Sequence, residues 1–240
     1  AMGYRFYFQF TLTAYGKDLE PGLPEKTHLA AVFRELSRRL GKNRVVWRYD
    51  PVICSEDWTI PRHLETFGRL AEELKGAADT CVVSFLDRYR KIEKKLDQLG
   101  LRPPDSRERE EFLRAAARMA AAAGMELETC SEEGDYPSLG VRQGSCISGE
   151  RIEKITGRRV TAAKDKTQRP SCGCVKSVDI GMYDTCAHGC VYCYASRSRE
   201  LIGKNMGLAR PDSPYLSGEP DGRERITERD MPSVLGKPVR

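Results

Sequence analysis

Five of the nine cysteines of this 240-residue chain lie within residues 172–194. Cys186, Cys190 and Cys193 have the spacing C-x3-C-x2-C, and Cys172 and Cys174 form a C-x-C pair just upstream. Thiolates this close in sequence can reach a single metal centre from one turn of loop. Three thiolates leave one coordination position open, which is typical of catalytic rather than structural metal sites.

Zinc is the alternative occupant of this loop. A structural zinc site would need a fourth ligand, for which His188 or Cys174 is available. A disulfide framework is not expected, because the sequence shows no signal peptide and is too long to need covalent staples. We therefore expect a cytoplasmic protein. In a reducing compartment, clustered cysteines indicate metal binding or catalysis.

The residues around the triplet resemble a known motif. Tyr192 precedes the last cysteine and gives C-x3-C-x-Φ-C, where Φ is aromatic, as in radical S-adenosylmethionine (SAM) enzymes. The longer run 186–195 is similar to the cluster loop of spore photoproduct lyase. This resemblance implies a [4Fe-4S] cluster on the three cysteines, SAM on its fourth iron, Tyr192 near the adenine, and a ferredoxin or flavodoxin as electron donor.

The resemblance also implies a strand before the motif and a helix after it. We predict a short strand over 175–182 and a short helix over 195–204. In radical SAM enzymes the cysteine loop follows the first barrel strand, whereas here it follows at least four βα units.

Four further cysteines could form a second site. Cys130 ends a predicted strand, Cys146 lies in a Gly-Ser-Cys loop, and together with Cys172 and Cys174 they supply four thiols. Four thiols can close a tetrahedral zinc site or hold an iron–sulfur cluster. The alternative is that Cys130 and Cys146 are ordinary buried thiols.

Alternating strands and helices must position these residues. Hydrophobic periodicity predicts an α/β fold: an incomplete (β/α) barrel-like parallel sheet with a cysteine-rich C-terminal region. We expect domains at 1–140 (partial barrel), 141–205 (metal-binding region) and 206–240 (extended or disordered tail). The expected strands are 4–13, 45–50, 81–86 and 125–130, and the expected helices are 29–40, 60–74, 89–99, 106–123 and 148–156.

The strands carry polar residues toward their carboxyl ends, all on one parity. Active sites of barrels lie at that end. We therefore expect a pocket lined by Arg48, Asp50, Ser84 and Glu128, with Thr11 and Thr13 nearby. The alternative for the charged residues is a structural ion pair between strands. His28 and His63 are expected at the surface of their helices.

Charge is distributed unevenly along the sequence. The net charge is +5, and the basic surplus lies in residues 151–240, which would suit an anionic partner such as nucleic acid or a phosphorylated metabolite. A solvated basic surface is the alternative, because no basic run interleaved with aromatic residues occurs. No apolar run is long enough to cross a membrane.

Most of residues 3–215 resembles an uncharacterised family, numbered 1848 among the domains of unknown function. The resemblance rests on five stretches: 7–13 (YFQFTLT), 47–51 (WRYDP), 128–132 (ETCSE), 172–181 (CGCVKSVDIG) and the cysteine loop. Members usually carry a further N-terminal βα stretch, so we expect this sequence to be a piece of a longer chain. Two hypotheses remain: a radical SAM enzyme of unknown substrate, or a non-enzymatic zinc module that contacts nucleic acid through its basic C-terminal half.

Overall fold

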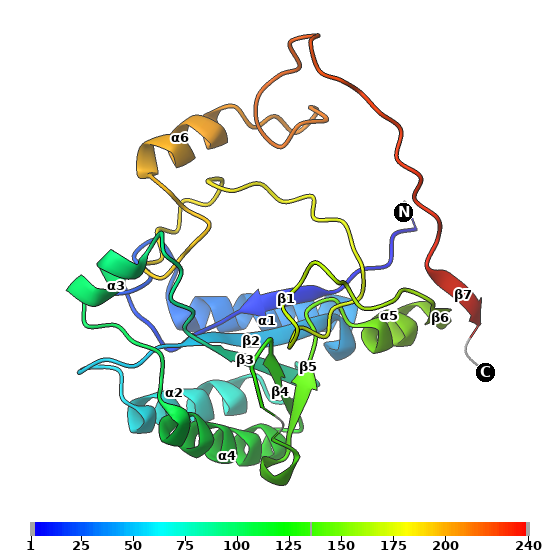
Figure 1. Ribbon diagram of the computed structural model, residues 1–240. Coiled ribbons are helices and arrows are strands. Elements are labelled where there is room, and N and C mark those ends of the chain that lie inside the picture. The colour runs from blue at the N-terminus through cyan, green and yellow to red at the C-terminus, as the bar shows by residue number, and fades with distance from the viewer. Residues whose placement is uncertain (1–2, 135, 239–240) are drawn as a thin grey trace.

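A five-stranded parallel sheet forms the centre of the protein (Figure 1). The computed structural model describes residues 3–134 and 136–238. The strands lie in the order of the sequence, and each pairs in parallel with the next. They are β1 (Phe8–Thr11), β2 (Val45–Val52), β3 (Thr80–Phe85), β4 (Glu126–Cys130) and β5 (Val141–Gly144). The predicted α/β class with a parallel sheet is confirmed.

Helices connect β1 to β4 as expected for βα units, whereas only a short 3-10 turn lies between β4 and β5. The longest, α4, begins after Pro103-Pro104 with a capping box, in which the Asp105 side chain accepts from the Glu108 amide and the Glu108 side chain accepts in return. The helices are α1 (Lys26–Leu40), α2 (Ile60–Glu73), α3 (Glu93–Gln98), α4 (Ser106–Ala122), α5 (Gly149–Thr156) and α6 (Arg199–Gly207), with short 3-10 turns η1 (Lys42–Arg44) and η2 (Pro137–Leu139).

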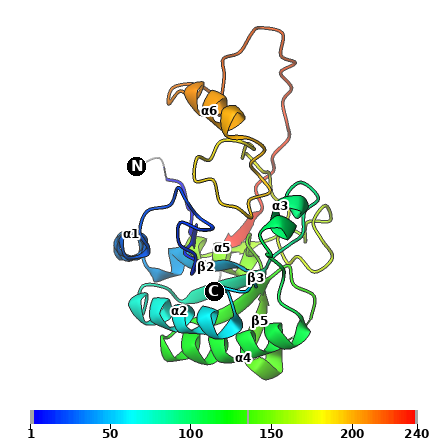
Figure 2. The same ribbon diagram turned by 90° about the vertical axis from the view of Figure 1, so that its left-hand side faces the viewer.

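One face of the sheet is apolar and packs on helices. Trp47 and Tyr49 of β2 and Val83 of β3 are fully buried in a core with Phe67 of α2 and Phe112 of α4. The Trp47 and Phe67 rings stack with centroids 4.8 Å apart. Helices α2 and α4 lie together beneath this face (Figures 1 and 2). Alternation along the strands therefore leaves the opposite parity facing away from these helices.

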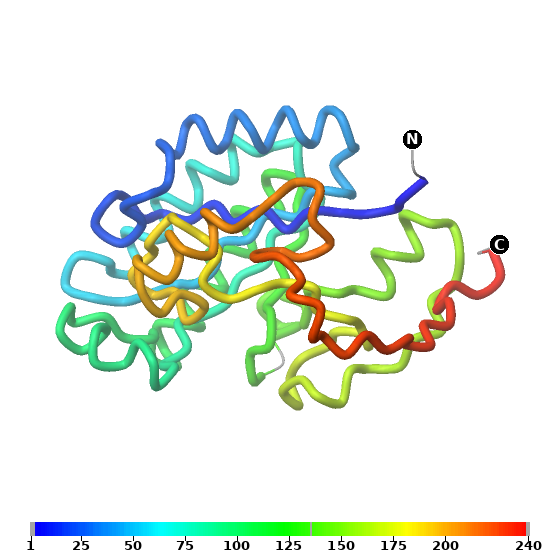
Figure 3. Tube along the Cα trace, turned by 90° about the horizontal axis from the view of Figure 1, so that it is seen from above, coloured from blue at the N-terminus to red at the C-terminus, as the bar shows by residue number. Residues whose placement is uncertain are grey.

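The C-terminal half of the chain covers that opposite face. The segment after β5 crosses above the sheet in both side views (Figures 1 and 2). After α6 the chain runs back toward α5 (Figure 3) and ends in β7 (Leu235–Pro238), which pairs antiparallel with β6 (Arg158–Val160). No helix in the described residues is long and apolar enough to cross a membrane.

Two expectations are wrong, and one strand was missed. The predicted strand over 175–182 is an irregular segment that makes only an isolated bridge between Val175 and Lys164. The fifth strand was not predicted, because β5 reads Val-Arg-Gln-Gly and shows no apolar alternation. His63 is fully buried rather than exposed, and its ring nitrogens contact the Tyr49 hydroxyl at 2.9 Å and the Ile53 carbonyl oxygen at 2.8 Å.

Candidate functional site

A cavity of about 560 Å³ lies where the strands end. The strands contribute Thr11, Arg48, Asp50, Ser84 and Cys130 to its wall. The cysteine loop contributes the rest of one side, with His188, Cys190, Tyr192, Cys193 and Tyr194. The ends of the strands and the cysteine loop thus share one cavity. The end of β3 and the loop are about 100 residues apart in the sequence. Its volume falls within the range of small-molecule sites, about 300–1,000 Å³.

Arg48 and Asp50 form the polar centre of the strand side. Arg48 Nε donates to Asp50 Oδ2 at 3.1 Å, and the Ser84 hydroxyl donates to the other oxygen of the same carboxylate. Burial works against the charge on Arg48, but Asp50 and the nearby thiols of Cys146 and Cys130 outweigh it and raise the pKa of the guanidinium. A fixed cation and carboxylate therefore lie side by side at the floor of the cavity.

Glu128 does not line this cavity. It shares the parity of Cys130 but lies two residues earlier on β4, about 7 Å further from the carboxyl end of the strand. There it lines a separate small cleft with Arg142 and Arg151. Burial raises the pKa of Glu128, against the two arginines. The expected pocket set is therefore reduced to Arg48, Asp50 and Ser84.

Backbone contacts hold the cysteine loop against the segment that follows β1. The Gly22 amide donates to the His188 carbonyl oxygen at 2.9 Å, and the Val191 amide donates to the Leu19 carbonyl oxygen at 2.9 Å. A Cβ on Gly22 would lie 2.5 Å from the His188 oxygen, which only a glycine avoids. The cysteine loop therefore packs against the segment that follows the first strand, although it comes much later in the sequence.

Glu20 is a buried carboxylate beneath the loop that the sequence did not reveal. Its Oε1 accepts from the Thr13 hydroxyl at 2.6 Å and from the Tyr192 hydroxyl, and its Oε2 pairs with Lys26. Burial first, and then Glu20, raise the pKa of Tyr192, so the phenol remains a donor. The ring of Tyr192 lies on the cavity wall and packs on Tyr15 with centroids 5.8 Å apart. Glu20 lies in a Pro- and Gly-rich loop, where no hydrophobic periodicity marks a residue as buried.

The three thiols of the motif lie on one loop, and two of them line the cavity. Cys190 and Cys193 line the wall, joined by a turn in which the Cys193 amide donates to the Cys190 carbonyl oxygen at 3.2 Å. Cys186 is exposed. Burial, followed by Glu20, raises the pKa of Cys190 to about 11, so a metal would have to displace its proton. Within the described residues, no three or more His, Cys, Asp or Glu side chains converge on one point as a metal site does.

The four remaining candidate thiols lie close together at the end of β4 and β5. Cys130 Sγ and Cys146 Sγ are 3.0 Å apart, and the Ile147 amide donates to Cys174 Sγ at 3.3 Å. Burial opposes ionisation of the Cys172 thiol, but hydrogen bonds from Cys174 and Ser131 outweigh it and lower the pKa of this thiol. The four thiols thus form two neighbouring pairs, and a metal shared by all four stays a prediction.

A second ion pair borders the cavity and was also missed. Arg169 Nη1 donates to Asp87 Oδ1 at 3.2 Å, and its other nitrogen contacts Oδ2 of the same carboxylate and the Tyr89 hydroxyl. The Tyr89 ring packs on Tyr194 of the cysteine loop with centroids 4.4 Å apart. All four residues line the cavity. Apart from Tyr194, which belongs to the run 186–195, none of them lies in a motif, so only the fold brings them to the site.

Comparison with known proteins yields one family. The family described as Domain of unknown function (DUF1848) matches residues 1–195, which confirms the resemblance seen in the sequence. No curated protein and no solved structure matches the chain.

Proposed function

We propose that this chain is an iron–sulfur enzyme of the radical SAM type with an unknown substrate. The chain belongs to the family described as Domain of unknown function (DUF1848). The observation that carries the proposal is the shared cavity, which joins Cys190 and Cys193 to Arg48 and Asp50. A [4Fe-4S] cluster would be held by Cys186, Cys190 and Cys193. The chemistry that such a cluster supplies when bound is the reductive cleavage of SAM.

The donor set of the loop suits such a cluster. Three thiolates on a cluster would leave one of its positions open, and Cys190 and Cys193 already line the cavity. Since the three thiols do not converge on one point in the described residues, the loop would have to close around the cluster. The thiols lie on a segment tied to the rest of the fold by Gly22 and Leu19. The order of the sequence departs from radical SAM enzymes, in which the loop follows the first strand. The contact of the loop with the segment after β1 supports an equivalent position for it in this proposal.

The chain's own residues would bind and orient the small molecules. Arg48 presents a guanidinium that can hold a carboxylate in a two-pronged contact, in exchange for part of its contact with Asp50. Asp50 and Ser84 offer an acceptor and a hydroxyl to an amine or a ribose. Tyr192, which Glu20 fixes in place, offers an aromatic wall for a base.

SAM cleavage tests the proposal. The anaerobically reconstituted chain is incubated with SAM and dithionite, and 5′-deoxyadenosine is measured by chromatography. We expect its formation in the wild type, its loss in Cys190→Ala, and a marked reduction in Asp50→Asn. Glu128→Gln is the matched control, because Glu128 lies in a different cleft, and should leave the yield unchanged. A colourless protein that contains zinc and binds nucleic acid would instead favour the zinc module.

A further inference from the structure

Cys130 lines the cavity, and its thiol lies in contact with that of Cys146, which lines a neighbouring pocket. The proposed cluster uses neither thiol. Their sulfur atoms are 3.0 Å apart, and both residues are half-buried rather than enclosed. A disulfide needs about 2.05 Å between the sulfurs, so an approach of about 1 Å would join them. The ends of the neighbouring strands β4 and β5 set this distance, since Cys130 pairs with Gly144 in the sheet.

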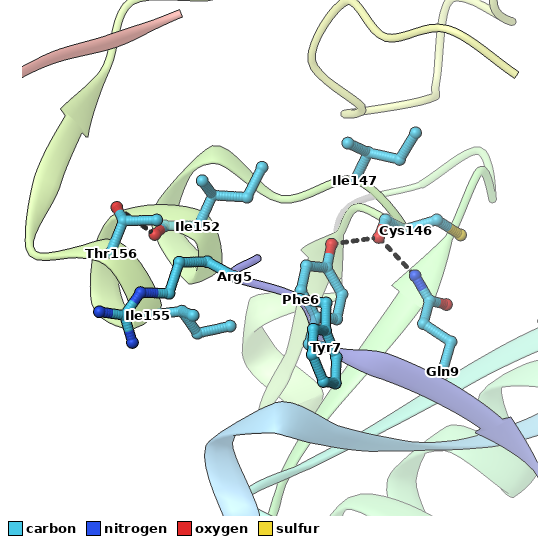
Figure 4. A pocket seen from close by; sticks show the side chains of 9 residues that line it. All are labelled: Arg5, Phe6, Tyr7, Gln9, Cys146, Ile147, Ile152, Ile155 and Thr156. Carbon is cyan, nitrogen blue, oxygen red and sulfur yellow. Dashed lines mark hydrogen bonds between the residues drawn. The ribbon is translucent and has the colours of Figure 1, made fainter. Parts of the chain in front are cut away.

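Cys146 is held more firmly than an ordinary loop cysteine. The hydroxyl of Tyr7 donates to its carbonyl oxygen at 2.6 Å, and the side-chain amide of Gln9 donates to the same oxygen (Figure 4). The Tyr7 hydroxyl also accepts from the Ser148 amide at 3.1 Å. Tyr7 and Gln9 both come from the β1 segment, so the loop after β5 is fixed across the sheet.

The guanidinium of Arg48 lies against the sulfur of Cys146. Arg48 Nη1 is 2.7 Å from Cys146 Sγ, while its other end pairs with Asp50. Cys146 Sγ is therefore held between a guanidinium and a second thiol. Cys130, on the far side, has its thiol against Cys146 Sγ. One cysteine thus has the surroundings of an attacking thiol and the other lies within reach to resolve it.

We propose that Cys130 and Cys146 form a redox-active dithiol that reacts with disulfides. The Cys146 thiolate attacks one sulfur of a disulfide RSSR, forms a mixed disulfide and releases RS⁻. Cys130 then loses its proton to solvent and attacks the Cys146 sulfur, which releases the second RS⁻ and forms the Cys130–Cys146 bond. Two electrons pass from the cysteine pair to RSSR. Arg48 contacts Cys146 Sγ and lines the cavity together with Cys130, so each oxidation state presents a different acceptor to the guanidinium.

Oxidised glutathione is the probe that tests this proposal. The full chain is purified without air, treated with EDTA, exposed to glutathione redox buffers and quenched with N-ethylmaleimide. Peptide mapping then identifies each disulfide. We expect a Cys130–Cys146 cross-link as the main product. Cys130→Ser should instead trap one glutathione on Cys146, and Cys146→Ser should give no cross-link at Cys130. Cys54→Ala, which removes a buried thiol of the core, should leave the cross-link unchanged.

Two results would overturn the proposal. One is oxidation spread over the exposed and half-buried cysteines with no excess of the Cys130–Cys146 product. The other is stoichiometric Zn²⁺ binding that protects Cys130, Cys146, Cys172 and Cys174 together, which would make the four thiols one metal site. Because the experiment is run without iron, its outcome is independent of the cluster on the cysteine loop.

Discussion

Gly22 lies against the backbone of His188, and its amide donates to the His188 carbonyl oxygen at 2.9 Å. A Cβ added to Gly22 would lie 2.5, 2.7 and 2.9 Å from the His188 oxygen, Cα and carbonyl carbon. Because these are backbone atoms, they cannot rotate away as a side chain can. The close approach fixes the cysteine loop to the segment after β1, and so to the cavity.

Gly22→Ala should therefore detach the cysteine loop without unfolding the sheet. We expect faster hydrogen exchange at the Val191 amide, which donates to the Leu19 carbonyl oxygen in the same contact, and a lower yield of SAM cleavage. Gly203→Ala is the matched control, since nothing lies within 4 Å of the added Cβ. Equal protection of Val191 in both variants and the wild type would show that the loop does not depend on this contact.

Tyr192→Phe tests the anchor between the loop and Glu20. Removing the hydroxyl takes one partner from a carboxylate that is buried beneath the loop. Leaving a buried charged acceptor short of a donor costs about 1–3 kcal/mol, so urea unfolding should show a loss of that size. Tyr4→Phe, at an exposed tyrosine, should change the free energy of unfolding by less than about 0.5 kcal/mol. Equal effects of the two substitutions would exclude a structural role for the Glu20 contact.

Because His63 is buried, we expect the stability of the protein to depend on pH. Burial lowers the pKa of this histidine in the folded protein below its value of about 6.5 in the unfolded chain. The unfolded chain therefore binds more protons in this range, and stability is lost as the pH falls through about 6.5, by up to about 1.4 kcal/mol per pH unit.

The matched variant for this effect is His63→Gln. Its amide can still donate to the Ile53 carbonyl oxygen and accept from Tyr49, but it does not titrate. Unfolding free energies at pH 7.5 and 5.5 should differ more in the wild type than in the variant. If the two proteins lose the same stability over this interval, another group causes the acid sensitivity.

The sequence was sufficient for the parts of the fold that follow from periodicity. Alternation along β2 placed Trp47 and Tyr49 toward the helices and Arg48 and Asp50 away from them, and the structure has this arrangement. The parity of a residue does not, however, predict how close it lies to the carboxyl end of its strand. Glu128 has the right parity but lies too early on β4, so it faces a different cleft.

Contacts between remote segments could not be predicted. Glu20, Asp87 and Arg169 reach the cavity from loops, where no periodic pattern marks a residue as buried or paired. His63 is polar by composition, but it lies between Tyr49 and the Ile53 carbonyl oxygen, and only the packed structure supplies those partners. Segment 175–182 has strand-like composition, yet without a neighbouring strand its Ile180 is exposed.

Iron and acid-labile sulfide content after anaerobic reconstitution tests the central claim most directly. We predict about four iron and four sulfide per chain in the wild type, as a [4Fe-4S] cluster requires, with an oxygen-sensitive brown colour. The triple variant Cys186→Ala, Cys190→Ala and Cys193→Ala should lose this content, while Cys54→Ala should keep it. A triple variant that incorporates as much iron as the wild type, or a colourless wild type that retains zinc instead, would contradict the proposed cluster.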